Sequence, residues 1–142
     1  VVDVKVVLYD GTYHDVDSSG MSFEIAGSHA IRTAVSQANP TLLEPIMKLT
    51  IRVPDTFNGE VMGDVNSKRG RILGMNPEGG YTTIETEVPQ AEILRYSTEL
   101  RSLTQGMGSF NTEFARYEAV PFNIAEKTVA EAKRAKEAAT EA

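Results

Sequence analysis

The chain contains no cysteine among its 142 residues. That absence excludes a disulfide framework, a thiolate zinc site and a cysteine nucleophile, and it is consistent with a reducing compartment. No apolar run approaches the ~20 residues that a helix needs to cross a bilayer. A secretory leader is not recognisable either. From these absences we expect a cytoplasmic protein without a membrane segment.

The chain also lacks a phosphate-cradling loop of the P-loop kind. Gly74 and Gly79 have the right spacing, but Gly80 stands where that loop requires a lysine. We therefore expect neither nucleotide hydrolysis nor a bound cofactor from these residues. His14 with Asp15 and Asp17 suggests an alternative, a small metal-dependent enzyme, although ligands so close in sequence rarely converge without a second segment.

The charge balance is acidic, with 20 aspartates and glutamates against 14 lysines and arginines and a net charge of −6. A protein that binds nucleic-acid backbones usually carries a basic face, so the overall balance argues against that function. Lys68, Arg69 and Arg71 nevertheless cluster at one predicted helix end. The cluster is either an ordinary solvated surface or a local site for phosphate groups.

Residues 1–41 predict one strand, one loop and one helix. Apolar and polar residues alternate over residues 1–9, which is the period of a half-buried strand. Asp10 and Gly11 end that strand and leave His14 in the connection. Asp17, Ser18 and Ser19 are helix-starting residues, and a helix is expected from about Ser19 to Ala38, with Asp17 as its N-cap. The strand has no predicted partner, so we expect an unprotected edge.

Residues 42–121 predict a complete α+β unit. Strands are expected at 46–53, 71–75, 81–88 and 108–117, a helix between Pro54 and Gly70, and a second helix at 90–103. Residues 46–53 alternate, with Met47, Leu49, Ile51 and Val53 inward, and residues 76–80 predict a turn. The order βαββαβ is the ferredoxin-like arrangement. The two halves repeat a pattern, because the spacing from proline to the glycine after the helix is 16 residues for Pro54 and 17 for Pro89.

The two ends of the chain carry separate expectations. Residues 122–142 are rich in alanine, glutamate and lysine, which favour helix, but the apolar face is thin. We therefore expect a C-terminal helix that frays beyond about Ala135. The chain begins at Val1, without methionine and within a strand pattern, so we expect a segment of a longer protein.

Five stretches together resemble bacterial translation elongation factor G, the GTPase that drives translocation on the ribosome. Residues 11–19 (GTYHDVDSS) resemble the tip loop of its fourth domain, and residues 43–47 (LEPIM) the passage into its fifth domain. Residues 63–71 and 100–110 resemble the two helix ends of that fifth domain, and residues 117–121 the exit from its last strand. The resemblance runs in order from Val1 to about Pro121.

The resemblance implies a partial, ribosomal-protein-like β-α segment of the fourth domain, a ferredoxin-like fifth domain and a C-terminal tail. It places His14 beside tRNA and mRNA in the decoding centre, within a tip loop of Gly11, Thr12, Tyr13, His14 and Asp15. Aspartates that face RNA are unfavourable, so Asp15 and Asp17 are expected to cap the helix or to turn inward. Ribosomal RNA contacts are expected from the second unit, at Lys68, Arg69, Arg71, Arg101, Ser102 and Gln105. For Arg101 the alternative is a salt bridge to Glu99 or to a nearby strand. GTP and magnesium would belong to other domains of the parent protein, so this segment itself is not expected to be an enzyme.

Some positions depart from the family pattern. Gly20 stands where a glutamate would complete a capping box with Asp17, Leu94-Arg95 replaces a common Phe-Gly, and Met107 replaces a frequent arginine. These departures leave a related paralogue that acts in ribosome recycling as an alternative. A second alternative is a stand-alone ferredoxin-like interaction module, with self-association through the strand at residues 2–8.

Overall fold

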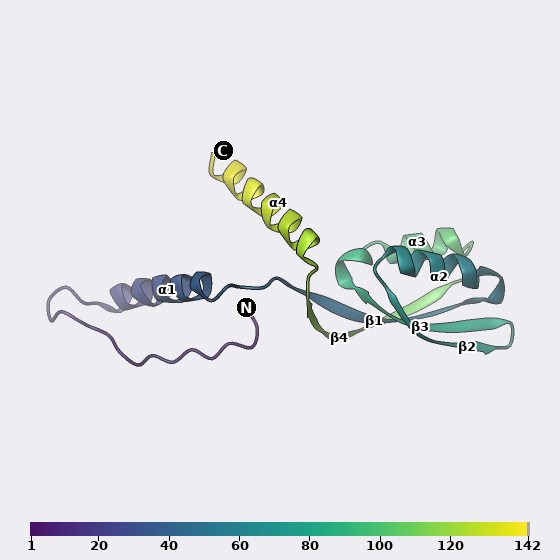
Figure 1. Ribbon diagram of the computed structural model, residues 1–142, viewed down its shortest axis with the longest axis horizontal. Helices are drawn as coiled ribbons and strands as arrows, with labels where there is room; N and C mark the ends of the chain where they lie inside the picture. The colour runs from purple at the N-terminus through teal and green to yellow at the C-terminus, as the bar shows by residue number, and fades with distance from the viewer. Residues whose placement is uncertain (142) are drawn as a thin grey trace. The chain divides into compact units, whose positions relative to one another are not determined.

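The computed structural model describes residues 1–141. The chain divides into two compact units, Val1–Pro40 and Thr41–Ala142, and each is described here by itself. Helices and strands follow one another along the chain as Figure 1 shows. None of the helices in the described part of the chain is both long and apolar enough to span a membrane.

The first unit contains a single regular element, the helix α1 (Gly20–Gln37). The predicted strand at residues 1–9 is wrong, because no residue before α1 is in a strand. A strand is defined by hydrogen bonds to a neighbouring strand, and residues 1–10 have no such partner. No residue of this unit is buried, and the alternating Val2, Val4, Val6 and Leu8 are all exposed.

The N-cap of α1 is Ser19 rather than the predicted Asp17. The Ser19 side chain accepts a hydrogen bond of 3.2 Å from the backbone N–H of Ser22, and the two hydroxyls lie 2.9 Å apart. Gly20 is therefore the first helical residue, and the third is Ser22. A capping box on Ser19 would need glutamate or glutamine at position 22, so Gly20 does not occupy the capping-box position that the sequence predicted.

The second unit is a four-stranded antiparallel sheet in the order β2-β3-β1-β4. The predicted ferredoxin-like βαββαβ order is confirmed. Two 3₁₀ turns, η1 (Asp55–Phe57) and η2 (Gln90–Glu92), precede the two helices. The remaining elements are β1 (Leu43–Pro54), α2 (Asn58–Ser67), β2 (Arg71–Glu78), β3 (Tyr81–Pro89), α3 (Tyr96–Leu103), β4 (Ser109–Ala119) and α4 (Phe122–Glu141).

Several element boundaries differ from the sequence prediction. The turn expected at 76–80 contains only Gly79 and Gly80, both with positive φ, which is the two-residue connection that suits a twisted hairpin. The helix expected at 90–103 is interrupted, because the backbones of Ile93 and Arg95 have φ of −115° and −116° with ψ near +15°. The C-terminal helix α4 extends to Glu141, and fraying beyond about Ala135 stays a prediction. Ala142, the last residue of the predicted tail, lies outside the described residues.

The core lies between one face of the sheet and the two helices α2 and α3, which lie on the same side of the sheet (Figure 1). Leu49, Ile51 and Val53 of β1 are fully buried there, as their predicted alternation requires. Met47, predicted to point inward with them, is only half-buried. The other buried members come from β3, α2 and α3, and they are Ile84, Val88, Val61, Val65, Tyr96 and Leu100.

Gly70 fits where no larger residue does. Its backbone N–H donates to the Val65 carbonyl at 2.9 Å and ends α2. A Cβ on Gly70 would overlap the Val65 side chain and lie 2.7 Å from the Val65 carbonyl oxygen. The turn from α2 into β2 therefore depends on glycine for close approach rather than for an unusual backbone angle.

The other face of the sheet carries an ion-pair network centred on Glu87 of β3. Its carboxylate accepts two hydrogen bonds from Arg116 of β4, both 2.9 Å, and one from Arg71 of β2 at 2.7 Å. These bonds lower the pKa of Glu87 to about 2. Because β1 lies between β3 and β4, the Arg116 side chain crosses the central strand, where its register partner Ile46 is 5% exposed.

Gly70→Ala should destabilise the second unit by about 1–3 kcal/mol, the usual cost of forcing an extra methyl into a packed site. Gly74→Ala is the matched control, because nothing lies within 4 Å of a Cβ at that position. Urea unfolding followed by far-ultraviolet circular dichroism measures both variants. Equal stability of the two variants would contradict the close approach at Gly70.

The Glu87 network should make stability depend on acid pH. A lowered pKa means that the carboxylate stabilises the fold above an unfolded pKa of about 4.3, and that this stabilisation is lost as pH falls toward 2. We expect the loss to be about 1–2 kcal/mol, because Arg71 and Arg116 are partly solvated. The drop in unfolding free energy between pH 5 and pH 2 should be smaller in Glu87→Gln. An identical drop would show that the network contributes nothing.

Candidate nucleic-acid interface

The predicted tip loop is closed by Ser18. Its hydroxyl accepts a hydrogen bond of 2.7 Å from the backbone N–H of His14, and its own N–H donates to the His14 carbonyl at 3.1 Å. The Gly11 N–H donates to the Asp10 carboxylate at 2.8 Å. Sequence reasoning treated Ser18 only as a helix-starting residue, yet this side chain fixes the turn that carries His14.

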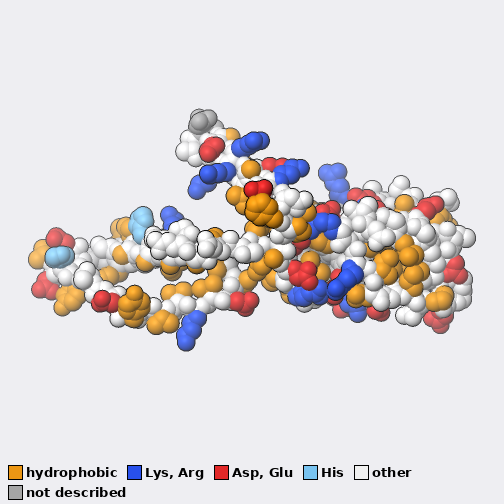
Figure 2. Space-filling model, viewed as in Figure 1, with side chains coloured by type: hydrophobic (Ala, Val, Ile, Leu, Met, Phe, Trp, Pro, Cys, Tyr) orange, Lys and Arg blue, Asp and Glu red, His pale blue; other side chains and the backbone are white. Residues whose placement is uncertain are grey.

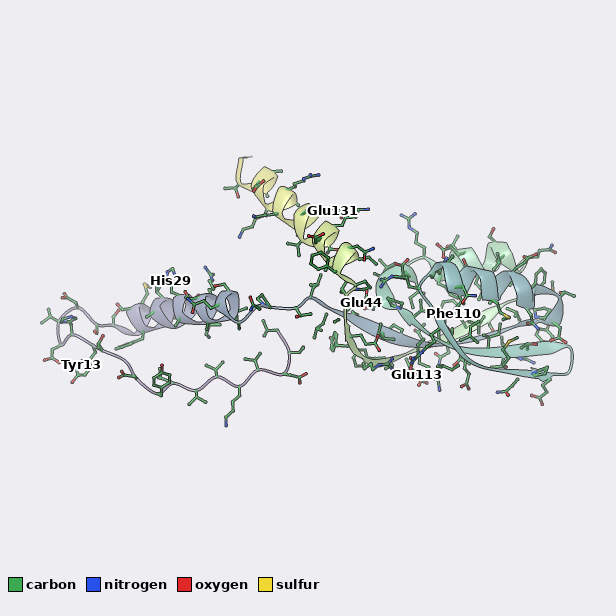
Figure 3. The ribbon with its side chains drawn as sticks, viewed as in Figure 1. Tyr13, His29, Glu44, Phe110, Glu113 and Glu131 are labelled. Carbon is green, nitrogen blue, oxygen red and sulfur yellow. The ribbon has the colours of Figure 1, made fainter. Side chains whose placement is uncertain are left out.

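The side chains of the tip loop point into solvent. Tyr13, at the bend between the extended segment and α1, is 72% exposed (Figure 3). The whole stretch from Gly11 to Asp15 is exposed, and no hydrogen bond to the imidazole of His14 is found within residues 1–141. The loop therefore presents to solvent an aromatic ring and an imidazole.

The aspartates of the loop take neither of the roles that sequence reasoning gave them. Asp15 and Asp17 are exposed, whereas a helix cap or an inward orientation was expected. The N-cap is Ser19 instead, since its side chain accepts the hydrogen bond from the Ser22 N–H and the helix begins at the next residue. Across the described residues, no group of three or more histidine and carboxylate side chains is arranged to hold a metal ion.

The predicted basic cluster is distributed over internal ion pairs. Lys68 lies 2.7 Å from Asp64 and 3.0 Å from Glu99, and its side chain is 15% exposed. Burial alone would lower the pKa of Lys68, but the hydrogen bonds to the two carboxylates outweigh it and raise that pKa. Lys68 is thus held within the second unit by α2 and α3.

Arg69 makes the most complete of these pairs. Two of its nitrogens donate to Glu44 at 2.7 and 2.9 Å, and a third donates to Glu92 at 3.1 Å. The hydrogen bonds to Glu44 are the main reason why the pKa of Arg69 is raised. Its backbone has φ of +58°, an uncommon value outside glycine, which turns the chain after α2. Arg69 therefore joins the start of β1, the start of β2 and η2.

The third predicted cation of the cluster, Arg71, is different. It contributes one hydrogen bond to Glu87, and its side chain remains 68% exposed. Figure 2 shows Lys and Arg side chains intermingled with Asp and Glu on the visible face of this unit. Arg71 is therefore the member of the cluster that is best placed to meet an external anion.

The other three predicted RNA contacts lie together at the C-terminal end of α3. Arg101, Ser102 and Gln105 are exposed, and none of the ion pairs found among the described residues includes Arg101. The two alternatives for Arg101, a pair with Glu99 or with a nearby strand, are thus not observed. The loop that follows α3 turns sharply, because Gln105 has φ of +52° and Gly106 has φ of +82°.

Carboxylates lie beside this end of α3, which we call the α3 corner and which consists of Arg101, Ser102 and Gln105. A shallow groove between α2 and α3 is lined by Ser102 and Gln105 together with Glu60, Asp64 and Glu99. Carboxylates repel phosphate, so an RNA approaching the corner would have to contact Arg101 and the loop rather than enter the groove. The corner combines one cation with hydrogen-bonding groups, which suits contact with a single stretch of backbone.

Comparison with known proteins gives a consistent result over most of the chain. The family model for domain IV of elongation factor G matches residues 1–39, and the family model for the elongation factor G C-terminus matches residues 41–128. Elongation factor G from Aquifex pyrophilus is 50% identical over 131 residues, which is 92% of this chain and 19% of that protein.

A crystal structure of a Thermus thermophilus protein agrees with the fold, with a TM-score of 0.78 and 43% sequence identity over 89% of this chain and 19% of the other. The chain thus spans about a fifth of the length of both relatives. Family models cover both units in chain order, and the identity is high over most of the sequence. The chain therefore belongs to the elongation factor G family.

Proposed function

We propose that this chain is the ribosome-binding C-terminal part of a translational GTPase that promotes movement of tRNA and mRNA during protein synthesis. The observation that carries the proposal is the ordered match of both units to elongation factor G domains, at 50% identity to the Aquifex protein. GTP and magnesium would be bound by domains outside this chain, and the site of action would be the cytoplasm.

The tip loop would act as a wedge at the decoding centre. Its turn is formed in advance by Ser18, so little ordering is required when it meets RNA. Tyr13 and His14 offer ring faces for stacking and an imidazole for hydrogen bonds to sugar or phosphate.

The second unit would contact ribosomal RNA through the α3 corner. Arg101, Ser102 and Gln105 are exposed together, whereas Lys68 and Arg69 are held by carboxylates of the same unit. Because these two side chains are already paired within the unit, two of the six predicted contacts are not available to bind phosphate. Of the original basic cluster, only Arg71 remains mostly exposed, and it lies on the other face of the sheet, so it would make a contact separate from the corner.

A role in ribosome recycling is the second candidate. Met107 replaces an arginine that is frequent in the family, and it is half-exposed beside the proposed RNA contacts. Loss of that cation would weaken one phosphate contact. Self-association is a third possibility, because the apolar side chains of residues 2–8 are exposed and the backbone there has no strand partner.

His14→Ala tests the wedge. In a full-length elongation factor G that carries this sequence, we expect single-round translocation to slow by about tenfold, which corresponds to ~1.4 kcal/mol of transition-state stabilisation. Ribosome-dependent GTP hydrolysis should remain near normal, because hydrolysis belongs to another domain. The control is His29→Ala, since His29 is an exposed histidine on α1 outside the loop.

Unchanged translocation in His14→Ala would contradict the wedge and make recycling the leading function. Equal slowing by His14→Ala and His29→Ala would also contradict it, because the effect would then belong to the unit as a whole rather than to the loop.

Arg101→Ala tests the α3 corner. Each phosphate neutralised by a cation contributes about 0.7–0.9 to the slope of log affinity against log salt. We therefore expect Arg101→Ala to reduce that slope by roughly this amount when binding to ribosomes is titrated with potassium chloride. Arg69→Gln should leave the slope unchanged and lower the midpoint of urea unfolding. A similar slope change for both variants would mean that Arg69 also contacts RNA.

A further inference from the structure

Thr104 is a fully buried threonine at the C-terminal end of α3. Its hydroxyl donates a hydrogen bond of 2.7 Å to the Leu100 carbonyl and accepts one of 2.8 Å from the backbone N–H of Gly108. One side chain thus joins the last turn of α3 to the residue that precedes β4. A buried hydroxyl is costly without partners, and here both of its hydrogen-bonding directions are used.

Gly108 is matched to this hydroxyl. A Cβ on Gly108 would lie 2.8 Å from the Thr104 Oγ1 and 3.1 Å from both Leu100 Cγ and Thr104 Cγ2. The backbone of Gly108 can therefore approach Thr104 only because it has no side chain. The pair defines how closely the end of α3 and the start of β4 are drawn together.

The loop between these two residues has little freedom. It consists of Gln105, Gly106 and Met107, and the first two have positive φ. The Gly106 N–H donates to the Arg101 carbonyl at 2.8 Å, and the Met107 N–H donates to the Thr104 carbonyl at 3.0 Å. A left-handed backbone at Gln105 costs roughly 1–2 kcal/mol, so these bonds and the Thr104 bridge must hold it in place.

We infer that Thr104 is a positioning residue for RNA binding, whose hydroxyl fixes the direction in which the loop presents Gln105 beside Arg101. The inference rests on the proposed contact between this corner and ribosomal RNA. Thr104 itself touches no ligand, since it is buried. Thr104 acts through the geometry of the loop, because the strained backbone of that loop has few other conformations close to the native conformation.

The test uses Thr104→Val, which keeps the shape and removes the hydroxyl, and Thr104→Ser, which keeps the hydroxyl. Both are made in a full-length elongation factor G that carries this sequence, alone and combined with Gln105→Ala. The first readout is affinity for ribosomes. The second is amide hydrogen exchange at residues 105–108, which reports loop order independently of RNA.

We expect Thr104→Val to weaken ribosome binding by about fivefold, the equivalent of one ordinary hydrogen bond, and to accelerate exchange at Gly108. Thr104→Ser should restore both. The double variant with Gln105→Ala should bind no more weakly than Gln105→Ala alone, because a positioning residue acts only through the residue that it positions.

Three results would overturn the inference: unchanged exchange at Gly108 in Thr104→Val, unchanged affinity in that variant despite faster exchange, or additive losses in the double variant. Failure of the proposed function gives a different pattern. In that case Gln105→Ala and Arg101→Ala leave affinity unchanged, whereas the exchange measurement still decides whether Thr104 holds the loop.

Discussion

The second unit depends on the central strand β1, which is paired along its length with β3 on one side and β4 on the other. On one face of β1, the side chains under α2 and α3 are those of Leu49, Ile51 and Val53. On the other face, Ile46 lies beneath the Glu87 ion pairs. Because both helices pack on the same strand, their C-terminal ends occupy fixed places. The proposed RNA corner and the Arg69 ion pairs are held by that packing.

The first unit has a different physical basis. None of its residues is buried, so the hydrophobic effect contributes little to its order within this chain. Its tip loop is defined by local hydrogen bonds of Ser18 and Ser19 instead. The apolar side chains Met21, Ile25 and Ile31 of α1 and the alternating valines of the extended segment are exposed instead of forming a core.

The sequence predicted the fold of the second unit well and its polar contacts poorly. Period-2 alternation and the repeated proline-to-glycine spacing identified the βαββαβ order, because both report local geometry. Partners such as Glu44 for Arg69 and Glu87 for Arg116 lie 25 and 29 residues apart, and nothing local relates them. The N-cap of α1 was misassigned for another reason, since Asp17, Ser18 and Ser19 all have capping side chains and only the backbone decides among them.

The position of β1 also has a mechanical consequence. A pull on the chain at Thr41 enters the second unit at the start of its central strand. Because Leu43 pairs with Ala119, the chain enters β1 and leaves β4 at the same end of the sheet, so a pull between these two points loads the β1–β4 ladder at its end. Glu44, fastened by two hydrogen bonds to Arg69, lies at the point where the load arrives, and the Val120 N–H holds the Leu42 carbonyl at 2.9 Å. These contacts are therefore the first that such a pull would have to break.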